Sequence, residues 1–225
     1  MCARQLEYKM QFRDTDSLIF DMDGTLWDAT DTYAEAWNMA LRELKIDKVI
    51  QRKDLESLMG LEEKAVLQRV FPDESEDRQK VIANLIWEKQ DEHIPKAGGK
   101  LYEGVKEGLE QLSKIYKLFI VSNCPENTIN DFITWAGIKQ LFTDHETHGR
   151  TKKSKGENIK LIIERNNLKN AVYIGDTISD EKASKEAGVP FVFVNYGFGK
   201  PENVGVEFSS FPELTNYFLN LKSKP

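Results

Sequence analysis

Residues 18–25 are Leu-Ile-Phe-Asp-Met-Asp-Gly-Thr, an apolar run that ends in two carboxylates and a Gly-Thr turn. Residues i and i+2 of a strand point to the same side, so Asp21 and Asp23 can reach one pocket at the strand's carboxyl end. That edge is where ligands bind in open α/β sheets. One carboxylate could act as a nucleophile while the other moves a proton or helps to hold a metal ion. For these residues alone, a solvated acidic turn is the competing interpretation.

The composition is that of an ordinary globular protein. A chain of 225 residues, 40% hydrophobic and 30% charged, is long enough for one α/β domain with an insertion or for two small domains. The net charge of −6, without a basic stripe interleaved with aromatic residues, argues against nucleic-acid binding. Only Cys2 and Cys124 are present, which favours a reducing compartment over a disulfide framework. No segment has the apolar length of a signal peptide or membrane span, so we expect a cytoplasmic protein that does not contact membranes.

Apolar runs typical of buried parallel strands alternate with helical patterns. Strands are predicted at residues 17–22, 117–122, 171–174 and 191–194. Helices are predicted at residues 102–115, 126–136, 155–166 and 179–187. Strands that alternate with helices indicate right-handed βαβ units on a parallel sheet. The sequence therefore predicts an α/β fold.

Residues 30–96 interrupt this alternation. Their apolar spacing predicts helices and no strand, at residues 33–44, 52–58, 62–70 and 76–92. Pro95 and the pair Gly98-Gly99 then mark a hinge-like return to the α/β pattern. We therefore predict a core domain made of residues 1–29 and 97–225. A small helical cap domain, residues 30–96, would lie as a lid over the carboxyl end of the first strand.

Polar residues also follow the later strands. Ser122-Asn123 ends the second strand, Asp176 and Asp180 follow the third, and Lys155 opens the helix between them. Together with the first two carboxylates, these groups would converge at one edge of the sheet. Packed carboxylates are costly unless a cation neutralises them. Oxygen ligands in an open site suit Mg²⁺, which also binds substrate phosphate.

These segments resemble, in the right order, the four motifs of the haloacid dehalogenase superfamily of phosphohydrolases. The motifs are Asp21-Met22-Asp23-Gly24-Thr25, Ser122-Asn123, Lys155, and Gly175-Asp176-Thr177 through Asp180. The resemblance extends from Leu18 to about Gly199. It implies a Rossmann-like, doubly wound core with an inserted helical cap of the C1 type. Within the superfamily, the chain looks most similar to phosphoglycolate phosphatases.

The resemblance also implies a role for each motif residue. Asp21 would be the nucleophile that forms an aspartyl-phosphate, and Asp23 would protonate the leaving group and then activate water. Ser122, Asn123 and Lys155 would bind the phosphoryl group. Mg²⁺ would be held by Asp21, the backbone carbonyl of Asp23 and Asp176, with Asp180 in support.

The third motif departs from the pattern of many helical-cap members, which have Lys-Pro there. This chain has Lys152-Lys153-Ser154-Lys155-Gly156 instead. Lys-Gly-Glu before an apolar helix is similar to the form found in phosphoserine phosphatases. We therefore expect Lys155 to bind phosphate, with Lys153 as the alternative.

The predicted function is Mg²⁺-dependent hydrolysis of a small phosphorylated metabolite, of the phosphoglycolate, sugar phosphate or nucleotide class, by a monomer or homodimer. One alternative is a phosphomutase of the β-phosphoglucomutase type, but those enzymes usually carry a His where Tyr33 stands. A second is a 2-haloacid dehalogenase, which needs no metal and lacks the carboxylate corresponding to Asp23. A third is a catalytically silent binding protein, against which the intact motif residues argue.

Several other polar residues have a simpler interpretation. His145 and His148 lie three positions apart, but we expect surface histidines rather than a metal pair. Cys124 is expected to be a spacer rather than a nucleophile. The basic residues of the predicted cap could contact a distal anion of the substrate, although a solvated surface position is the simpler interpretation for each: Arg52, Lys53, Lys64 and Arg69.

Overall fold

The structure is a computed structural model that describes residues 12–200 and 205–222. Cys2 and the outermost residues of the predicted core domain lie outside this range. In chain order the elements are β1 (Ser17–Phe20), β2 (Trp27–Asp28), α2 (Thr30–Glu43), α3 (Arg52–Glu56), α4 (Glu63–Val70), α5 (Glu76–Ala97), β3 (Lys100–Leu101), α6 (Val105–Leu112), β4 (Lys117–Ser122), α7 (Thr128–Trp135), the 3₁₀ helix η1 (Lys139–Leu141), β5 (Asp144–Thr147), α8 (His148–Thr151), α9 (Lys155–Arg165), β6 (Ala171–Gly175), α10 (Ile178–Ala187), β7 (Phe191–Val194), β8 (Val206–Phe208) and α11 (Phe211–Lys222).

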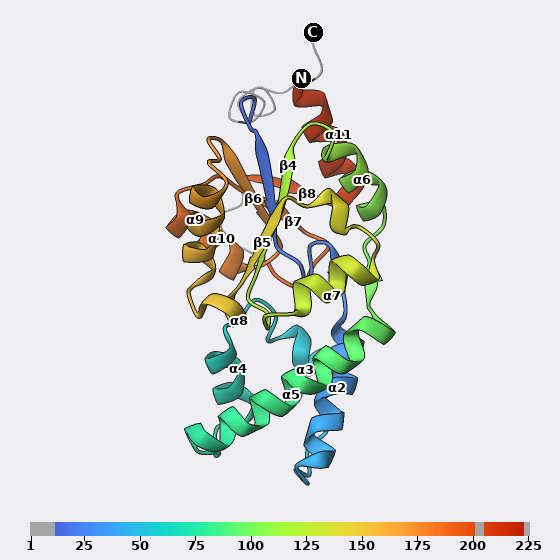
Figure 1. Cartoon of the computed structure of the whole chain (residues 1–225), viewed down its shortest axis with the longest axis vertical. Coiled ribbons are helices and arrows are strands. Elements are labelled where there is room, and N and C mark those ends of the chain that lie inside the picture. The colour runs from blue at the N-terminus through green and yellow to red at the C-terminus, as the bar shows by residue number, and fades with distance from the viewer. Residues whose placement is uncertain (1–11, 201–204, 223–225) are drawn as a thin grey trace.

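A parallel sheet of six strands, in the order β5-β4-β1-β6-β7-β8, forms the centre of the core (Figure 1). The first strand is central, because β1 pairs with β4 on one side and with β6 on the other. The chain therefore builds outward from β1 in both directions and places helices on both faces. This arrangement confirms the predicted α/β fold with a doubly wound parallel sheet.

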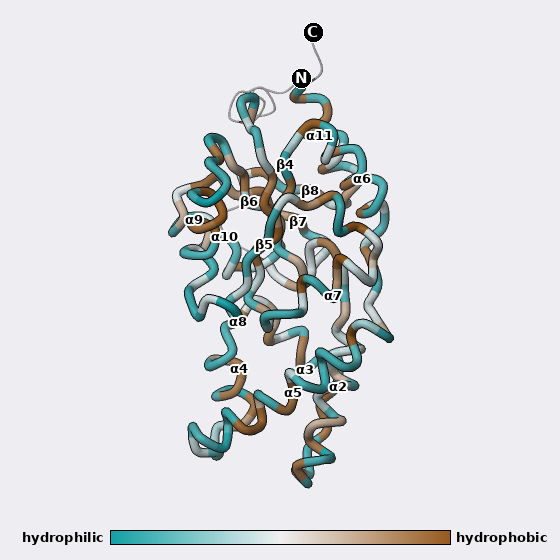
Figure 2. The backbone as a smooth tube through the Cα atoms, in the orientation of Figure 1, coloured by the Kyte–Doolittle hydropathy of each residue, from teal (hydrophilic) through white to brown (hydrophobic). Residues whose placement is uncertain are grey.

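Neighbouring residues of the central strands pack into two different hydrophobic cores. Leu18 and Phe20 belong to the larger core, which also contains residues of α6, α7 and α11. Ile19 between them belongs to the smaller core, where it meets Ile159 and Ile162 of α9. Figure 2 shows the hydrophobic colour concentrated in the strands. With both faces covered, these strands consist mainly of apolar residues, and the carboxylates follow at their ends.

Between residues 30 and 97 the chain forms only the helices α2 to α5. In Figure 1 these helices lie below the sheet, beyond the carboxyl ends of its strands. The two connections to the sheet pair with each other, because Trp27-Asp28 of β2 runs antiparallel to Lys100-Leu101 of β3. The boundaries at residues 30 and 96 stay a prediction. No helix in the described part of the chain is both long and apolar enough to cross a membrane.

Helix α5 continues beyond the predicted end at residue 92. It passes through Pro95 and ends at Ala97. Pro95 lies in the final turn, where its missing N–H removes a single helical hydrogen bond. Gly98 then ends the helix with φ +67°, and its N–H donates to the Ile94 carbonyl at 2.8 Å. The predicted first strand was also too long, since β1 ends at Phe20.

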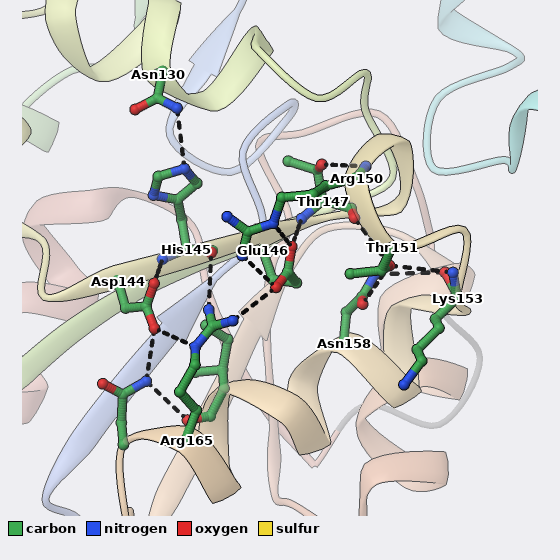
Figure 3. A network of polar contacts seen from close by, with 12 residues as sticks. Asn130, Asp144, His145, Glu146, Thr147, Arg150, Thr151, Lys153, Asn158 and Arg165 are labelled. Atoms are coloured by element: carbon green, nitrogen blue, oxygen red, sulfur yellow. Dashed lines mark hydrogen bonds and ion pairs between the residues drawn. The ribbon is translucent and has the colours of Figure 1, made fainter.

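Strand β5 was not predicted, because Asp144–Thr147 contains no apolar residue. It pairs with β4 from Phe119↔Asp144 to Ser122↔Thr147. Glu146 is only 1% exposed and accepts hydrogen bonds from Arg150 at 2.6 and 2.8 Å and from Arg165 at 3.0 Å (Figure 3). Side-chain hydrogen bonds and pairing with β4 thus stabilise this strand in place of apolar burial.

The same network fixes the segment that leads to α9. Thr151, at the end of α8, donates from Oγ1 to Asn158 Oδ1 of α9 at 2.7 Å (Figure 3). Ser154 caps α9 through a hydrogen bond from the Glu157 N–H at 3.1 Å, and the Glu157 carboxylate accepts from the Ser154 N–H at 2.9 Å. The Thr151–Asn158 hydrogen bond and the Ser154 cap therefore fix the start of α9, where Lys155 is the first residue.

Replacing Glu146 is expected to destabilise the protein in a pH-dependent way. Burial would raise the pKa of Glu146, but hydrogen bonds from Arg150, the Thr147 N–H and Arg165 outweigh it and lower the pKa. The stabilisation is therefore present above the ordinary Glu pKa and is lost as the pH falls through the lowered value. Glu146→Gln should reduce the free energy of unfolding at pH 7 by about 1–3 kcal/mol.

Urea unfolding of the wild type and the variant, at pH 7 and in steps below pH ~4, measures this difference. The exposed Glu164 on α9 provides the matched control Glu164→Gln, which should unfold like the wild type. A Glu146→Gln variant with wild-type stability at pH 7 would show that the network contributes nothing to the fold.

Candidate active site

The carboxylates predicted to form the site converge at the carboxyl ends of β1 and β6. Asp21 follows β1, and its N–H donates to the Ile174 carbonyl of β6 at 2.8 Å. Asp176 follows β6, and Asp180 lies in the first turn of α10. One oxygen from each of these three carboxylates lies within 4.8 Å of the others. All three residues are buried, with exposed fractions of 3% or less.

A glycine turn lets the first motif approach Asp176 closely. Gly24 has φ +87°, and a methyl group in its place would overlap the Asp176 carboxylate. Thr25 donates from Oγ1 to Asp176 Oδ1 at 3.1 Å, and the Phe198 N–H donates to Oδ2 at 2.7 Å. Sequence reasoning gave no role to Thr25 or Phe198, which come from segments far apart in the chain.

Lys155 is the lysine that reaches these carboxylates. Its Nζ donates to Asp21 Oδ1 at 3.0 Å and to Asp180 Oδ1 at 2.7 Å, and its side chain is 3% exposed. Lys153 is exposed, and Figure 3 shows its side chain extending away from the polar network. The geometry therefore favours Lys155 over Lys153 as a phosphate ligand.

Asp180 is surrounded by hydrogen-bond donors. Besides Lys155, it accepts from the Tyr173 hydroxyl at 3.1 Å and from the Thr177 hydroxyl at 2.6 Å. The backbone N–H groups of Thr177 and Asp176 also donate hydrogen bonds to Asp180 Oδ2, at 2.9 and 3.2 Å. This set favours a supporting role over direct metal binding. The spacing Thr177-x-x-Asp180 before a helix is a capping-box signal that could have indicated this role.

The cluster contains more carboxylate groups than positively charged groups. Burial raises the pKa of Asp21, with the Asp180 carboxylate adding to it and Lys155 opposing it. Burial, Asp180 and Asp21 likewise hold the pKa of Asp176 well above its usual range. Burial would lower the pKa of Lys155, but Asp180 and Asp21 outweigh it and raise the pKa. Three carboxylates against one ammonium leave a buried negative charge, and an oxygen-ligand set of this kind fits a divalent cation such as Mg²⁺.

Asp23 is half-buried and is not one of the three carboxylates of this cluster. Its Oδ1 accepts a hydrogen bond from the Tyr33 hydroxyl of α2 at 3.0 Å. Burial and the Asp21 charge raise the pKa of Asp23 to about 7, while the Tyr33 hydrogen bond lowers it. A carboxyl group with such a pKa can both donate and accept a proton near neutral pH. Sequence reasoning considered Tyr33 only as the position of a missing His, and no local pattern indicated its contact with Asp23.

Ser122 and Asn123 line the same pocket as Asp21 and Lys155. Ser122 ends β4 and is 4% exposed. Asn123 donates from Nδ2 to the Gly60 carbonyl, between α3 and α4, at 3.3 Å. Its buried Oδ1 has no hydrogen-bond partner within the described part of the chain.

The histidines predicted to lie on the surface are in fact half-buried. His145 on β5 lies 3.3 Å from the Asn130 amide nitrogen, and His148 Nδ1 lies 2.8 Å from the Lys153 carbonyl oxygen. Within residues 12–200 and 205–222, the group able to hold a metal ion contains neither of them. Cys124 is buried, and burial raises the pKa of its thiol, which disfavours the thiolate that a nucleophile needs.

Comparison with known proteins identifies the family to which the chain belongs. The sequence model described as "Haloacid dehalogenase-like hydrolase" matches residues 18–194. A phosphoglycolate phosphatase of Aquifex aeolicus is 29% identical over 188 residues, covering 81% of this chain and 86% of the relative. The pyrophosphatase PpaX of Listeria welshimeri is 25% identical over 194 residues, covering 84% of this chain and 87% of the relative.

Solved structures share the fold. A predicted phosphatase from Clostridium acetobutylicum superposes with a TM-score of 0.78 at 21% identity, covering 92% of this chain and 99% of that one. A CbbY variant from Rhodobacter sphaeroides, in complex with xylulose-1,5-bisphosphate, has a TM-score of 0.75 at 17% identity, covering 89% and 96%. Because the family match covers most of the chain and includes all the motif residues up to Asp180, this protein belongs to the haloacid dehalogenase-like hydrolases.

Proposed function

We propose that the protein is a Mg²⁺-dependent phosphomonoesterase that acts on a small phosphorylated molecule through an aspartyl-phosphate. The observation that carries the proposal is the buried cluster of Asp21, Asp176 and Asp180 around the Lys155 ammonium. Phosphoryl transfer depends mainly on placement and charge neutralisation, and this cluster can supply both. A cytoplasmic location and a monomeric or homodimeric state belong to the same proposal.

The first step is attack by an Asp21 oxygen on phosphorus, which breaks the bond to the leaving oxygen. Asp23 gives its proton to that oxygen, and the Tyr33 hydroxyl holds the Asp23 carboxylate in place. Water then attacks phosphorus of the aspartyl-phosphate while Asp23 takes its proton. Inorganic phosphate leaves, and Asp21 and Asp23 return to their starting states.

Phosphate and metal share the site in this scheme. Lys155, the Ser122 hydroxyl and Asn123 would bind the phosphoryl oxygens from the side of β4 and α9. Asp21, Asp176 and the backbone carbonyl of Asp23 would hold Mg²⁺, with Asp180 in support. When bound, the metal neutralises the phosphoryl group and lowers its repulsion of the Asp21 carboxylate.

Two alternatives fit the residues less well. A phosphomutase of the β-phosphoglucomutase type would need a His where Tyr33 stands, and Tyr33 is instead engaged with Asp23. A 2-haloacid dehalogenase needs neither the Asp23 carboxyl group nor a metal. The raised pKa of Asp23, which suits proton transfer, therefore favours the phosphomonoesterase. We also propose that residues 30–96 form the separate cap domain and close over the substrate.

The first test replaces the two leading carboxylates. Asp21→Asn should abolish hydrolysis of p-nitrophenyl phosphate, because an amide cannot form the phosphoenzyme. Asp23→Asn should slow turnover by about 10²–10⁴-fold, since proton transfer is lost. Steady-state kinetics with the exposed control Asp47→Asn, which should match the wild type, measures both effects. Turnover in Asp21→Asn at the wild-type rate would rule out this nucleophile.

A second test separates the two candidate lysines. Lys155→Ala should lower kcat by about 10²–10³-fold, because a preorganised charge at the phosphoryl group is lost. Lys153→Ala should leave kcat unchanged, since that side chain is exposed. Thermal unfolding of both variants shows whether each is folded. Equal losses of activity in two folded variants would contradict the assignment to Lys155.

A third test concerns the metal. EDTA should remove activity, Mg²⁺ should restore it, and Ca²⁺ should inhibit, because its looser coordination misplaces the reacting groups. Binding of Mg²⁺ should also raise the melting temperature of the wild type by mass action, and Asp176→Asn should reduce that shift. Full activity after exhaustive chelation would favour metal-free chemistry instead.

A further inference from the structure

The pocket that contains the catalytic carboxylates continues into the helical segment as an apolar cavity. One end is formed by Asp21, Asp23, Ser122 and Lys155 of the core. The other end is formed by apolar side chains of α2 to α5 and their connections, chiefly Trp37, Leu55, Leu58, Leu67, Ile86 and Trp87. A phosphoryl group bound at Asp21 would therefore direct its leaving group toward these side chains.

Within the described part of the chain, no lysine or arginine lines the apolar end, where a second anionic group would lie. Among residues 12–200 and 205–222, Lys155 is the only lysine or arginine that lines the pocket, and it is bound to Asp21 and Asp180. Arg52 pairs with Asp28, with Asp31 at 2.9 Å and with Glu56 at 2.7 Å, and it does not line the pocket. The idea that cap cations contact a distal anion is therefore not supported. The other candidates are exposed and also absent from the lining: Lys53, Lys64 and Arg69.

The polar side chains at this end are those of Glu63, Gln90 and His148, and Nδ1 of His148 lies 2.8 Å from the Lys153 carbonyl oxygen. Glu63 of α4 and Gln90 of α5 line the cavity. Burial raises the pKa of Glu63, and Lys152 and His148 oppose this rise. Lys152 lies with its Nζ 5.1 Å from the centre of the Trp87 ring, but it is not a lining residue. An anionic leaving group would lose its hydration here and meet a carboxylate.

The size of the cavity is also restrictive. Its volume is about 150 Å³. An apolar cavity of about this volume holds a benzene-sized molecule. Gly60, whose carbonyl accepts a hydrogen bond from Asn123 of the core at 3.3 Å, also lines the pocket. This volume, which includes the end where the phosphoryl group would bind, favours a small leaving group such as one six-membered ring or a short alkyl chain.

We propose that the physiological substrate is a phosphate monoester with a small, uncharged, largely apolar leaving group, such as an aromatic or short alkyl alcohol. This inference rests on the proposed phosphomonoesterase function and narrows it. It sets the chain apart from the phosphoglycolate phosphatase and pyrophosphatase named among its relatives, whose substrates carry a second anionic group. Burial of the apolar leaving group would supply binding free energy, and Gln90 could bind a single hydroxyl or amide on it.

The decisive measurement compares kcat/KM for matched substrates with Mg²⁺ present. Benzyl phosphate tests the preferred class, and phosphoglycolate tests the anionic class. The phosphate esters of 3-hydroxypropionamide and 3-hydroxypropionate differ in charge but hardly in size. We expect benzyl phosphate to exceed phosphoglycolate by at least about 100-fold, and the amide to exceed the carboxylate by at least about 10-fold.

A carboxylate ester that reacts as fast as its amide, or phosphoglycolate that reacts as fast as benzyl phosphate, would overturn the inference while leaving the phosphomonoesterase function intact. Lack of hydrolysis of every ester, p-nitrophenyl phosphate included, would overturn the function itself and the inference with it. The two failures are therefore distinguishable in one set of assays.

Matched variants on α4 test the cavity directly. Val66→Lys places a cation among the lining residues, whereas Ala65→Lys places the same charge on the exposed side of the helix. Val66→Lys should shift the amide-to-carboxylate ratio at least about tenfold toward the carboxylate, and Ala65→Lys should leave it unchanged. Equal ratios in both variants would contradict the inference.

A milder pair keeps the test valid if Val66→Lys does not fold. Glu63→Gln removes the acidic group that lines the cavity, and the adjacent, exposed Glu62→Gln serves as its control. Glu63→Gln should improve the carboxylate ester relative to the amide severalfold, and Glu62→Gln should not. A ratio unchanged in Glu63→Gln would show that the carboxylate does not select the leaving group.

Discussion

The ion pair network of Lys155 is the interaction on which the rest of the site depends. The buried Lys155 ammonium lies 3.0 Å from Asp21, which follows β1, and 2.7 Å from Asp180, which lies in the first turn of α10. Without it, three carboxylates would be crowded together in a buried site with no counter-charge. The lysine thus offsets part of the negative charge of the cluster and places a positive charge beside the first carboxylate.

Much of the surrounding structure serves to hold this lysine and its partners. The arginines around Glu146 secure β5 and α8, Thr151 ties α8 to α9, and α9 begins at Lys155. On the other side, Thr177 caps α10 and orients Asp180. Residues on long, rigid elements are positioned more accurately than residues on loops, which suits chemistry that depends on placement.

The helical segment contributes in two different ways. Tyr33 of α2 donates a hydrogen bond to Asp23, so in the proposed reaction the segment would position the group that transfers protons, and its side chains also line the pocket. Its apolar side chains also define what may lie beyond the phosphoryl group. Under the proposal made above, the core and its motifs are shared with the relatives, and the helical segment would select a different leaving group.

The sequence by itself determined the α/β class, the helical stretch between residues 30 and 96 and the motif residues, because apolar runs and the residues that end them are local signals. It did not indicate β5, whose stability comes from Arg150 and Arg165 rather than from apolar residues of its own. Nor could it place Tyr33 against Asp23, or Thr25 and Phe198 against Asp176. Only the tertiary structure decided which cap side chains face the pocket, because helical periodicity indicates the buried face of each helix but not what that face is buried against.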